Sequence, residues 1–277
     1  MLKHSFIHIP RVGKATERKL WARGIHNWED CLREAGKLAL SPRLQRVIHS
    51  HLEISCQALS QGDAAFFETW LPTSELWRMY PEFFQKAVFL DIETTGLSPH
   101  WSDITIVGIY NGQDTEVFVK GKNLEDFPDE IRNYSLLVTF NGRQFDVPFL
   151  RARFPGLEMP LAHIDLRFLP KRLGLFGGLK NVERMLGLQR EGNLGDVDGY
   201  MATRLWQEYK KGNQAALDTL IRYNLEDVVN LKDIIELAYN MAIEGLPIIV
   251  KPLRRSPRPR LNLPYDSELI SWLRRSF

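Results

Sequence analysis

The sequence has too little cysteine and too few long apolar runs for several classes of protein. Its two cysteines, Cys31 and Cys56, lack the paired spacing of a zinc site and cannot build a disulfide framework, so we expect reduced, inert thiols. No stretch of about 18 uncharged apolar residues could span a bilayer. The N-terminus, MLKHSFIHIP, lacks the apolar core of a secretion signal. We therefore expect a cytoplasmic protein with no membrane partner.

Internal repeats and low-complexity tracts are also missing from the chain. With 277 residues, 44% of them hydrophobic and 25% charged, it can bury at least one full core. This composition is typical of an ordinary globular protein with one large domain and one small one.

Charge is distributed unevenly along the chain, although the net charge is only +2. Residues 1–50 contain 10 Lys and Arg against 4 Asp and Glu, and residues 251–277 contain 7 against 2. The segment between them has 19 against 28, so two basic ends flank an acidic centre. Clustered Lys and Arg attract phosphate, whereas carboxylates repel it unless bound cations neutralise them. The pattern suits a metal-dependent nuclease, and it equally suits solvated surfaces that happen to differ in charge.

Hydrophobic periodicity divides the chain into three parts. Residues 1–80 have apolar residues at helical spacing, with Gly24 and Gly36 as helix ends, and predict a small all-α domain. Residues 86–245 begin with the strand-like runs AVFLDIETTG, DITIVGIY, DTEVFVK and LLVTF and end in long helices. An Asn-Gly hairpin signal separates the second and third runs. We predict an α/β domain, a mixed sheet of about five strands that starts with a meander and is flanked by helices. Residues 246–277 form a basic, Pro- and Arg-rich tail, and its stretch KPLRRSPRPRLNLP should be extended.

Three short motifs carry acidic residues in positions that allow them to meet. In DIETTGL, Asp91 and Glu93 are two residues apart on a strand and therefore share a face. In NGRQFDVPF, Asp146 sits at a strand-to-helix junction, where an Asp is commonly just a helix cap. In YNLED, Tyr223 and Asp227 are one helical turn apart on the same face.

Together these residues fit the chemistry of phosphodiester hydrolysis. That reaction needs an activated water and a stabilised leaving oxygen, which two divalent ions about 3.5 to 4 Å apart can supply. Hard ions such as Mg²⁺ are bound by carboxylates and water. Four acids and a tyrosine, occurring in this order, therefore indicate a two-metal nuclease site.

The same motifs resemble those of the DEDD exonucleases, a family that includes polymerase proofreading domains, RNase D and RNase T. The matching residues are DIETTG, N-x-x-x-F-D and Y-x-x-x-D, and the tyrosine resembles the DEDDy branch. The stretches GLKNVERMLGLQRE, DGYMATRLWQEYKKG and YNLEDVVNL also look like the bacterial YprB-type predicted exonucleases, so the resemblance covers about residues 87–238. It implies an RNase H-like fold and 3′-to-5′ exonuclease activity with two Mg²⁺ or Mn²⁺ ions.

The resemblance also implies a role for each residue. Asp91 would bridge both metals, and Glu93 and Asp227 would complete the site of the metal that activates water. Asp146 would hold the second metal through water, and Tyr223 would orient or deprotonate the attacking water. The residues implied to bind substrate are Thr94, Leu97, Asn141 and Phe145. Leu97 would act as a wedge between the last two bases. Leu97 and Phe145 are also natural core residues, which is the alternative for both.

The N-terminal segment FIHIPRVGKATERKLWARGI resembles a helix-hairpin-helix unit, which presents backbone N–H groups to a phosphate. Gly13 and Lys14 match that pattern, whereas Arg11 replaces the first hairpin glycine. These three residues are candidates for contacts to a nucleic-acid backbone. The alternative is a helical cap that merely packs on the catalytic domain.

Other polar residues receive different interpretations. We expect His163 to be a buried, hydrogen-bonded histidine rather than a metal ligand, and Asp198 to be the N-cap of a helix. The remaining candidates, Lys171, Arg172 and Arg190, flank Gly-rich turns, where substrate contact and surface solubility explain them equally well.

Several functions remain open at this point. The first is an exonuclease acting on single-stranded DNA, and the second an exoribonuclease of the RNase D or RNase T kind, since metals act on phosphate and cannot separate DNA from RNA. A non-catalytic nucleic-acid-binding module belongs to a different class and would be favoured by a missing acid, yet all four acids are present. An endonuclease of the RNase H type fits the Tyr-x-x-x-Asp spacing less well.

Overall fold

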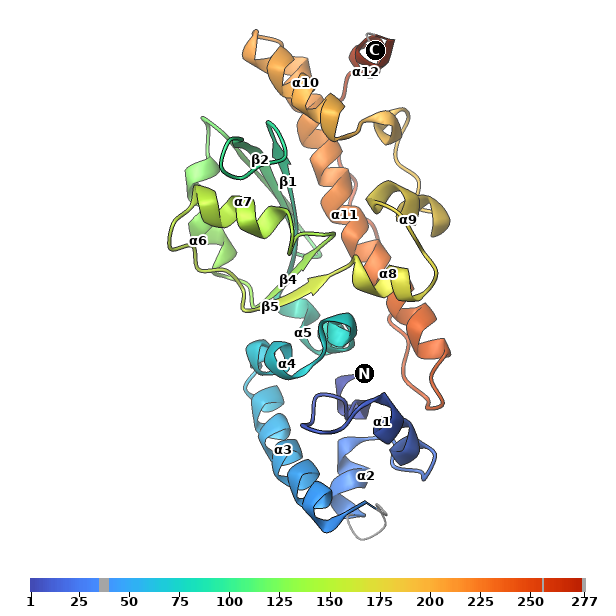
Figure 1. Cartoon of the computed structure of the whole chain (residues 1–277). Helices are drawn as coiled ribbons and strands as arrows, with labels where there is room; N and C mark the ends of the chain where they lie inside the picture. The colour runs from blue at the N-terminus through green and yellow to red at the C-terminus, as the bar shows by residue number, and fades with distance from the viewer. Residues whose placement is uncertain (35–39, 256, 276–277) are drawn as a thin grey trace.

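A five-stranded mixed sheet forms the centre of the computed structural model, which describes residues 1–34, 40–255 and 257–275. The strand order is β3-β2-β1-β4-β5, in which β1, β2 and β3 form an antiparallel meander and β4 and β5 run parallel to β1. The predicted α/β sheet with its initial meander is therefore confirmed (Figure 1). The strands are β1 (Ala87–Thr94), β2 (Ile104–Tyr110), β3 (Thr115–Val119), β4 (Leu136–Thr139) and β5 (Ala162–Asp165).

Helices cover both faces of the sheet. Val88, Leu90 and Ile92 of β1 point to the face that packs against α6 (Phe127–Ile131) and α7 (Asp146–Arg153). Because side chains alternate along a strand, Phe89, Asp91 and Glu93 point to the opposite face. Figure 1 shows α11 (Gln214–Glu244) crossing that face. The remaining elements of this part are η5 (Leu124–Asp126), α8 (Phe168–Arg172), α9 (Leu179–Met185), η6 (Leu194–Asp196) and α10 (Gly199–Lys210).

Helix α11 is the longest element, with 31 residues, and spans about 46 Å at 1.5 Å per residue. The side chain of Asn213 caps its start by accepting a hydrogen bond from the backbone N–H of Ala216. Most of its residues are buried on every side, which is typical of a central helix. In the described part of the chain, no helix combines the length and the apolar composition needed to cross a membrane.

Helices make up the N-terminal region, as predicted. Most of its buried apolar side chains belong to the same hydrophobic cluster as Phe89, Leu136 and Val138 of the sheet. Gly24, with φ of 82°, follows the first of these helices as expected, whereas Gly36 lies outside the described residues. The elements are η1 (Leu2–His4), α1 (Lys14–Trp21), α2 (Trp28–Arg33), α3 (Pro42–Ser60), α4 (Ala64–Trp70), η3 (Thr73–Met79), α5 (Tyr80–Phe83) and η4 (Phe84–Lys86).

The C-terminal tail consists of an irregular stretch followed by a helix that was not predicted from the sequence. The described residues of 251–264 contain no helix or strand, as expected, but they run along α11 and are fastened to it. Asn240 exchanges two hydrogen bonds with the backbone of Leu253, at 2.8 and 3.0 Å. The tail then ends in α12 (Ser267–Arg275), where Ile270 and Leu273 are fully buried. The stretch SELISWLRR has apolar residues three apart, so it buries one face despite its charge.

Candidate active site

Three carboxylates converge where α11 crosses β1. Asp91 and Glu93 project from the same face of β1, and Asp227 faces them from α11. Each offers one oxygen, and these three oxygens lie within 4.8 Å of one another. The spacing therefore brings together the residues that the sequence pattern selected. Such a set of hard oxygen ligands fits a divalent cation.

Asp146 lies beside this group at the first residue of α7, and it does not act as a helix cap. Phe145 occupies the N-cap position, and no side-chain hydrogen bond caps the helix. The capping interpretation is therefore wrong. Asp146 is 3% exposed, and its Oδ1 atom has no hydrogen-bond partner among the described residues. A buried carboxylate oxygen without a partner is costly, and a cation or its bound water would satisfy it.

Burial raises the pKa values of all four acids, and repulsion from other site acids adds to it for Asp91, Glu93 and Asp146. Desolvation is the main cause for Asp91 and Glu93, whose pKa values lie well above the ordinary range, and repulsion from Asp227 and Asp146 adds to it. Burial also raises the pKa of Asp146 to about 7, with Asp165 and Asp227 contributing repulsion. Like-charged groups held this close favour a bound cation, because it removes the repulsion that ionisation creates.

Arg190 is part of this site, so the interpretation of it as a surface residue that serves solubility is wrong. It is almost completely buried, and its Nη2 atom donates hydrogen bonds to Asp227 and, at 2.6 Å, to Glu183. Its Nε atom reaches the second Glu183 oxygen at 2.9 Å, and Asn230 donates to Glu183 at 2.8 Å. Arg190 therefore supplies positive charge to Asp227 and fixes its orientation from the loop after α9.

Asn224 positions Asp91 and was missed from the sequence. Its Nδ2 atom donates to Asp91 Oδ2 at 3.0 Å and approaches the Asp91 backbone oxygen at 3.3 Å. Gly108, opposite Asp91 on β2, makes this possible. A Cβ atom at Gly108 would lie 1.8 Å from Asn224 Oδ1, so only glycine leaves room for the amide. A glycine inside a strand is the sequence signal for such a close approach.

Tyr223 lies one turn before Asp227 on α11 and is 7% exposed. Burial and the neighbouring carboxylates raise its pKa well above 10, so the phenol stays protonated. The charged groups of Lys180 and Arg190 each lie 5.3 Å from the centre of its ring. Two cations therefore stand beside the acidic group, on the side of α9 and the loop that follows it. Lys180 and Glu183 were also missed, although both belong to the GLKNVERMLGLQRE stretch.

The four residues predicted to contact substrate occupy different environments. Leu97 is 87% exposed in the loop after β1, so the core interpretation is wrong for it, whereas Phe145 is partly buried and packs on Phe149. Thr94 is buried and its hydroxyl donates to Gly96 O at 2.6 Å. Asn141, with φ of 65°, accepts a hydrogen bond from Arg167 at 2.7 Å.

Trp101 was not selected from the sequence, although it shares the loop of Leu97. At 90% exposed it is among the most exposed large side chains in the described part of the chain. Its backbone N–H bonds to Ser98 O, which closes the turn that displays the indole. An exposed tryptophan on the loop that follows β1, the strand of Asp91 and Glu93, offers a flat surface on which a base can stack.

The predicted phosphate contacts of the N-terminal region lie at the start of α1. Gly13 occupies the N-cap position, and Arg11 is exposed with φ of 70°, a conformation that glycine normally adopts. Lys14 Nζ lies 2.5 Å from Glu75, a buried carboxylate that also binds Arg78 and Arg172. Lys14 is thus engaged in an internal ion pair.

The residues set aside in the sequence have structural roles. His163 is buried and shares a hydrogen bond of 2.8 Å with Thr139, and Asp198 caps α10 by accepting from Met201 N–H, both as predicted. Arg172 is fixed by Glu75 at 2.8 Å, so a purely solubilising role is wrong for it. Lys171 is exposed.

Comparisons with known proteins give both similar solved structures and a matching family. Three of the similar structures are described first. A family B DNA polymerase from the hyperthermophilic archaeon Pyrobaculum calidifontis is 20% identical, with a TM-score of 0.45, and covers 58% of this chain. This chain spans only 26% of that polymerase. A structure described as the apo form of the nuclease is 19% identical over 63% of this chain and 79% of its own, with a TM-score of 0.42. Brucella melitensis NrnC bound to pGG is 23% identical over 58% of this chain and 75% of its own, with a TM-score of 0.39.

A search of curated proteins finds no match. The family model of the RNase H superfamily, in contrast, matches residues 88–239, which include the sheet, all four acids and α11 up to Tyr239. This match extends over more than half of the chain. The protein therefore belongs to the RNase H superfamily.

Proposed function

We propose that this protein is a metal-dependent 3′-to-5′ exonuclease that hydrolyses single-stranded DNA with two divalent cations, Mg²⁺ or Mn²⁺. One observation carries the proposal: the clustered oxygens of Asp91, Glu93 and Asp227 lie beside Asp146, whose Oδ1 atom has no hydrogen-bond partner among the described residues. Membership of the RNase H superfamily supports a nuclease, and nucleases of this kind use divalent metals. The position of Tyr223, one helical turn before Asp227, supports an exonuclease of the DEDDy branch.

Each side chain has a role in this proposal. Asp91, Glu93, Asp146 and Asp227 would hold the cations, which activate water and stabilise the leaving oxygen when bound. Asn224 would keep Asp91 in the orientation for binding, and Arg190 would do the same for Asp227. The work of this protein's own residues is thus to orient carboxylates whose charges repel one another.

Tyr223 would orient the attacking water with its hydroxyl group. Its burial keeps the phenol neutral, so donating or accepting a hydrogen bond suits it better than removing a proton. Lys180 and Arg190, beside its ring, would attract the phosphate that is to be cleaved.

Substrate recognition rests on residues at the rim of the site. Leu97 and Trp101 are both largely exposed on the loop after β1 and would contact the terminal bases. Stacking on the Trp101 ring would accept any base, because every base has a flat face. Thr94, Asn141 and Phe145 would shape the position of the last nucleotide. In the N-terminal region, Arg11 and the start of α1 at Gly13 would contact the backbone further along the strand.

A time course with purified protein tests the proposal. A 5′-labelled single-stranded DNA is incubated with Mg²⁺ or Mn²⁺, beside the Asp91→Ala variant and an EDTA control. We expect a ladder that shortens from the 3′ end and is absent from both controls. Cleavage of a circular single strand at a comparable rate would instead indicate an endonuclease.

A matched RNA oligonucleotide separates the second candidate function, because an exoribonuclease would degrade it faster than the DNA. Discrimination between the two depends on contacts to the 2′-OH, not on the metal-binding acids. If the protein binds DNA or RNA but cleaves neither, the result would support a non-catalytic nucleic-acid-binding module instead of an enzyme.

A further inference from the structure

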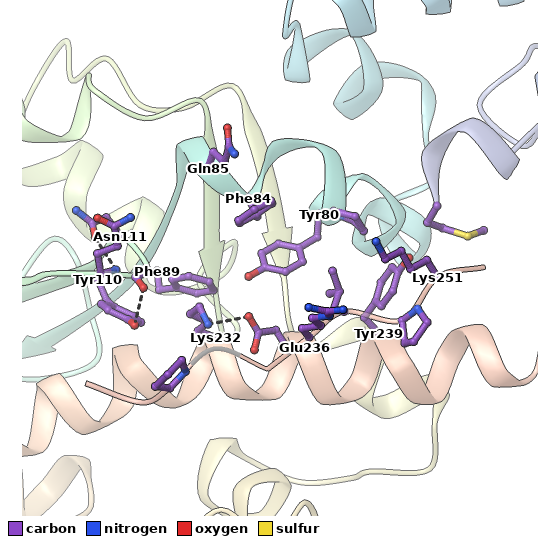
Figure 2. A pocket seen from close by; sticks show the side chains of 18 of the residues that line it. Tyr80, Phe84, Gln85, Phe89, Tyr110, Asn111, Lys232, Glu236, Tyr239 and Lys251 are labelled. Carbon is purple, nitrogen blue, oxygen red and sulfur yellow. Dashed lines mark hydrogen bonds and ion pairs between the residues drawn. The ribbon is translucent and has the colours of Figure 1, made fainter. Parts of the chain in front are cut away.

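A second cavity lies on the same face of the sheet as the acids, further along α11. It has a volume of about 1230 Å³ and is enclosed by α5, η4, the β1–β2 region, α11 and the tail (Figure 2). Lys232 is the first α11 residue to line it, about 7 Å along the helix axis from Asp227. None of the four site acids lines the cavity. It is therefore separate from the candidate active site.

Aromatic rings form the floor of this cavity. Phe89 and Tyr110 are opposite each other on β1 and β2, with ring centres 5.9 Å apart, and Tyr80 lies 6.3 Å from Phe89. These three rings are buried against one another. Phe84 is different, because 47% of it is exposed at the edge of the cavity, where Figure 2 shows its ring beside Tyr80. It leaves a ring face open to a planar ligand.

The charges around the cavity favour an anion. Glu236 is the one carboxylate among its described lining residues, and Lys232 neutralises it at 2.7 Å. Lys251 and Arg254 line the cavity from the tail, both exposed and without an ion pair in the described part of the chain. The hydrogen bonds that hold the backbone of Leu253 to α11 fix the segment that carries them.

An aromatic surface opposite uncompensated cations matches the chemistry of a nucleotide. Ligand pockets of about 300 to 1,000 Å³ lined by aromatic side chains and a few polar groups commonly lie between packed elements, and this cavity reaches that size. We propose that it binds a nucleoside monophosphate, with the base against Phe84 and the phosphate against Lys251 and Arg254. The inference does not depend on the proposed nuclease activity, because the pocket contains none of the metal-binding acids.

Isothermal titration calorimetry of the full chain with AMP tests the proposal. EDTA is present throughout, so that no metal can hold the nucleotide at Asp91 or Asp227. Adenosine and inorganic phosphate are titrated separately. We expect AMP to bind more tightly than either part, because both the base and the phosphate have a surface to contact. No heat with AMP at millimolar concentration would overturn the proposal, as would equal binding of AMP and inorganic phosphate, which would indicate an unspecific anion patch.

Three variants locate the binding. Arg254→Glu should weaken AMP binding at least tenfold, whereas Arg260→Glu, the same charge change on the same tail but outside the cavity lining, should leave it unchanged. Phe84→Leu keeps an apolar side chain and removes the ring, and it should weaken AMP binding about 5- to 100-fold. All three side chains are exposed, so we expect each variant to fold and to have the circular dichroism spectrum of the wild type. Full-strength AMP binding by both Arg254→Glu and Phe84→Leu would place AMP elsewhere and refute the site.

Discussion

Replacing Arg190 by Met offers a stringent test of the site, because one buried guanidinium neutralises two carboxylates. Methionine keeps the apolar stem but leaves Asp227 and Glu183 without their ion-pair partner. Removing one partner of a buried pair typically costs about 3 to 5 kcal/mol. For a chain of this size, where 1 kcal/mol shifts the midpoint by roughly 2 to 4 °C, we expect thermal unfolding roughly 6 to 20 °C below the wild type in EDTA.

The assay is thermal unfolding by circular dichroism in EDTA, repeated with Mg²⁺ or Mn²⁺. A cation would supply part of the lost charge at Asp227, so added metal should raise the midpoint of Arg190→Met more than that of the wild type. Arg184→Met is the matched control, since Arg184 is exposed on α9 and should change stability by about 0.5 kcal/mol or less.

A second background identifies the partner of Arg190. In Asp227→Asn the carboxylate is already gone, so Arg190→Met should lower stability by less than it does in the wild type. The loss that remains in this background comes from the ion pair with Glu183. Two results would contradict this reasoning: Arg190→Met unfolds at the same temperature as the Arg184→Met control, or it lowers stability equally in the wild type and in Asp227→Asn. In either case the guanidinium does not stabilise Asp227.

Three further predictions follow from individual residues. Asp91→Asn should abolish cleavage without lowering the unfolding midpoint in EDTA, because it relieves repulsion among buried acids; a cleavage rate equal to the wild type would mean that the site is elsewhere. Trp101→Ala should weaken binding of single-stranded DNA about 5- to 100-fold at every salt concentration, as measured by fluorescence anisotropy, and an unchanged affinity would exclude stacking. His8 is buried, and its pKa falls to about 3. Desolvation is the main cause, and repulsion from His51 and Arg78 adds to it. Its unfolded form takes up a proton near pH 6.5, so stability is lost as pH falls below that value, by about 2 kcal/mol at pH 5. Urea unfolding at pH 7.5 and 5.0 should therefore show a smaller loss for His8→Gln, and equal losses would contradict this.

The sheet and the pairs Asp91–Glu93 and Tyr223–Asp227 could be predicted from the sequence because they follow from local periodicity. Asp146 was selected only because its motif occurs together with the other two. Asp91 and Glu93 share a face by strand parity, and Tyr223 and Asp227 share one by helical spacing. The positions of Arg190 and Asn224 could not be predicted in this way, because their partners lie far away in the sequence. Gly108 alone gave a hint, since a glycine within a strand indicates that another group approaches the backbone closely.

Charged residues were harder to interpret than apolar ones. Lys14 and Arg172 look like surface cations in the sequence, yet both reach the buried Glu75. A long side chain can turn toward solvent or toward an internal carboxylate, and composition does not distinguish the two. Helix α12 was missed for a related reason, because the Pro- and Arg-rich composition around it outweighed the short amphipathic pattern that ends at Arg275.

The hydrophobic cluster that joins the N-terminal helices to the sheet has a consequence for how such a chain can change over time. Phe67 and Leu76 belong to the same cluster as Phe89 and Val138. The first 80 residues therefore cannot be exchanged for another module unless the apolar sheet residues that they cover are also replaced. A fragment that starts at Ala87 would present those side chains to water and to other copies of itself. Loss-of-function screens should therefore recover substitutions at Trp28 or Phe67 as readily as substitutions at the acids, although neither side chain is near the chemistry.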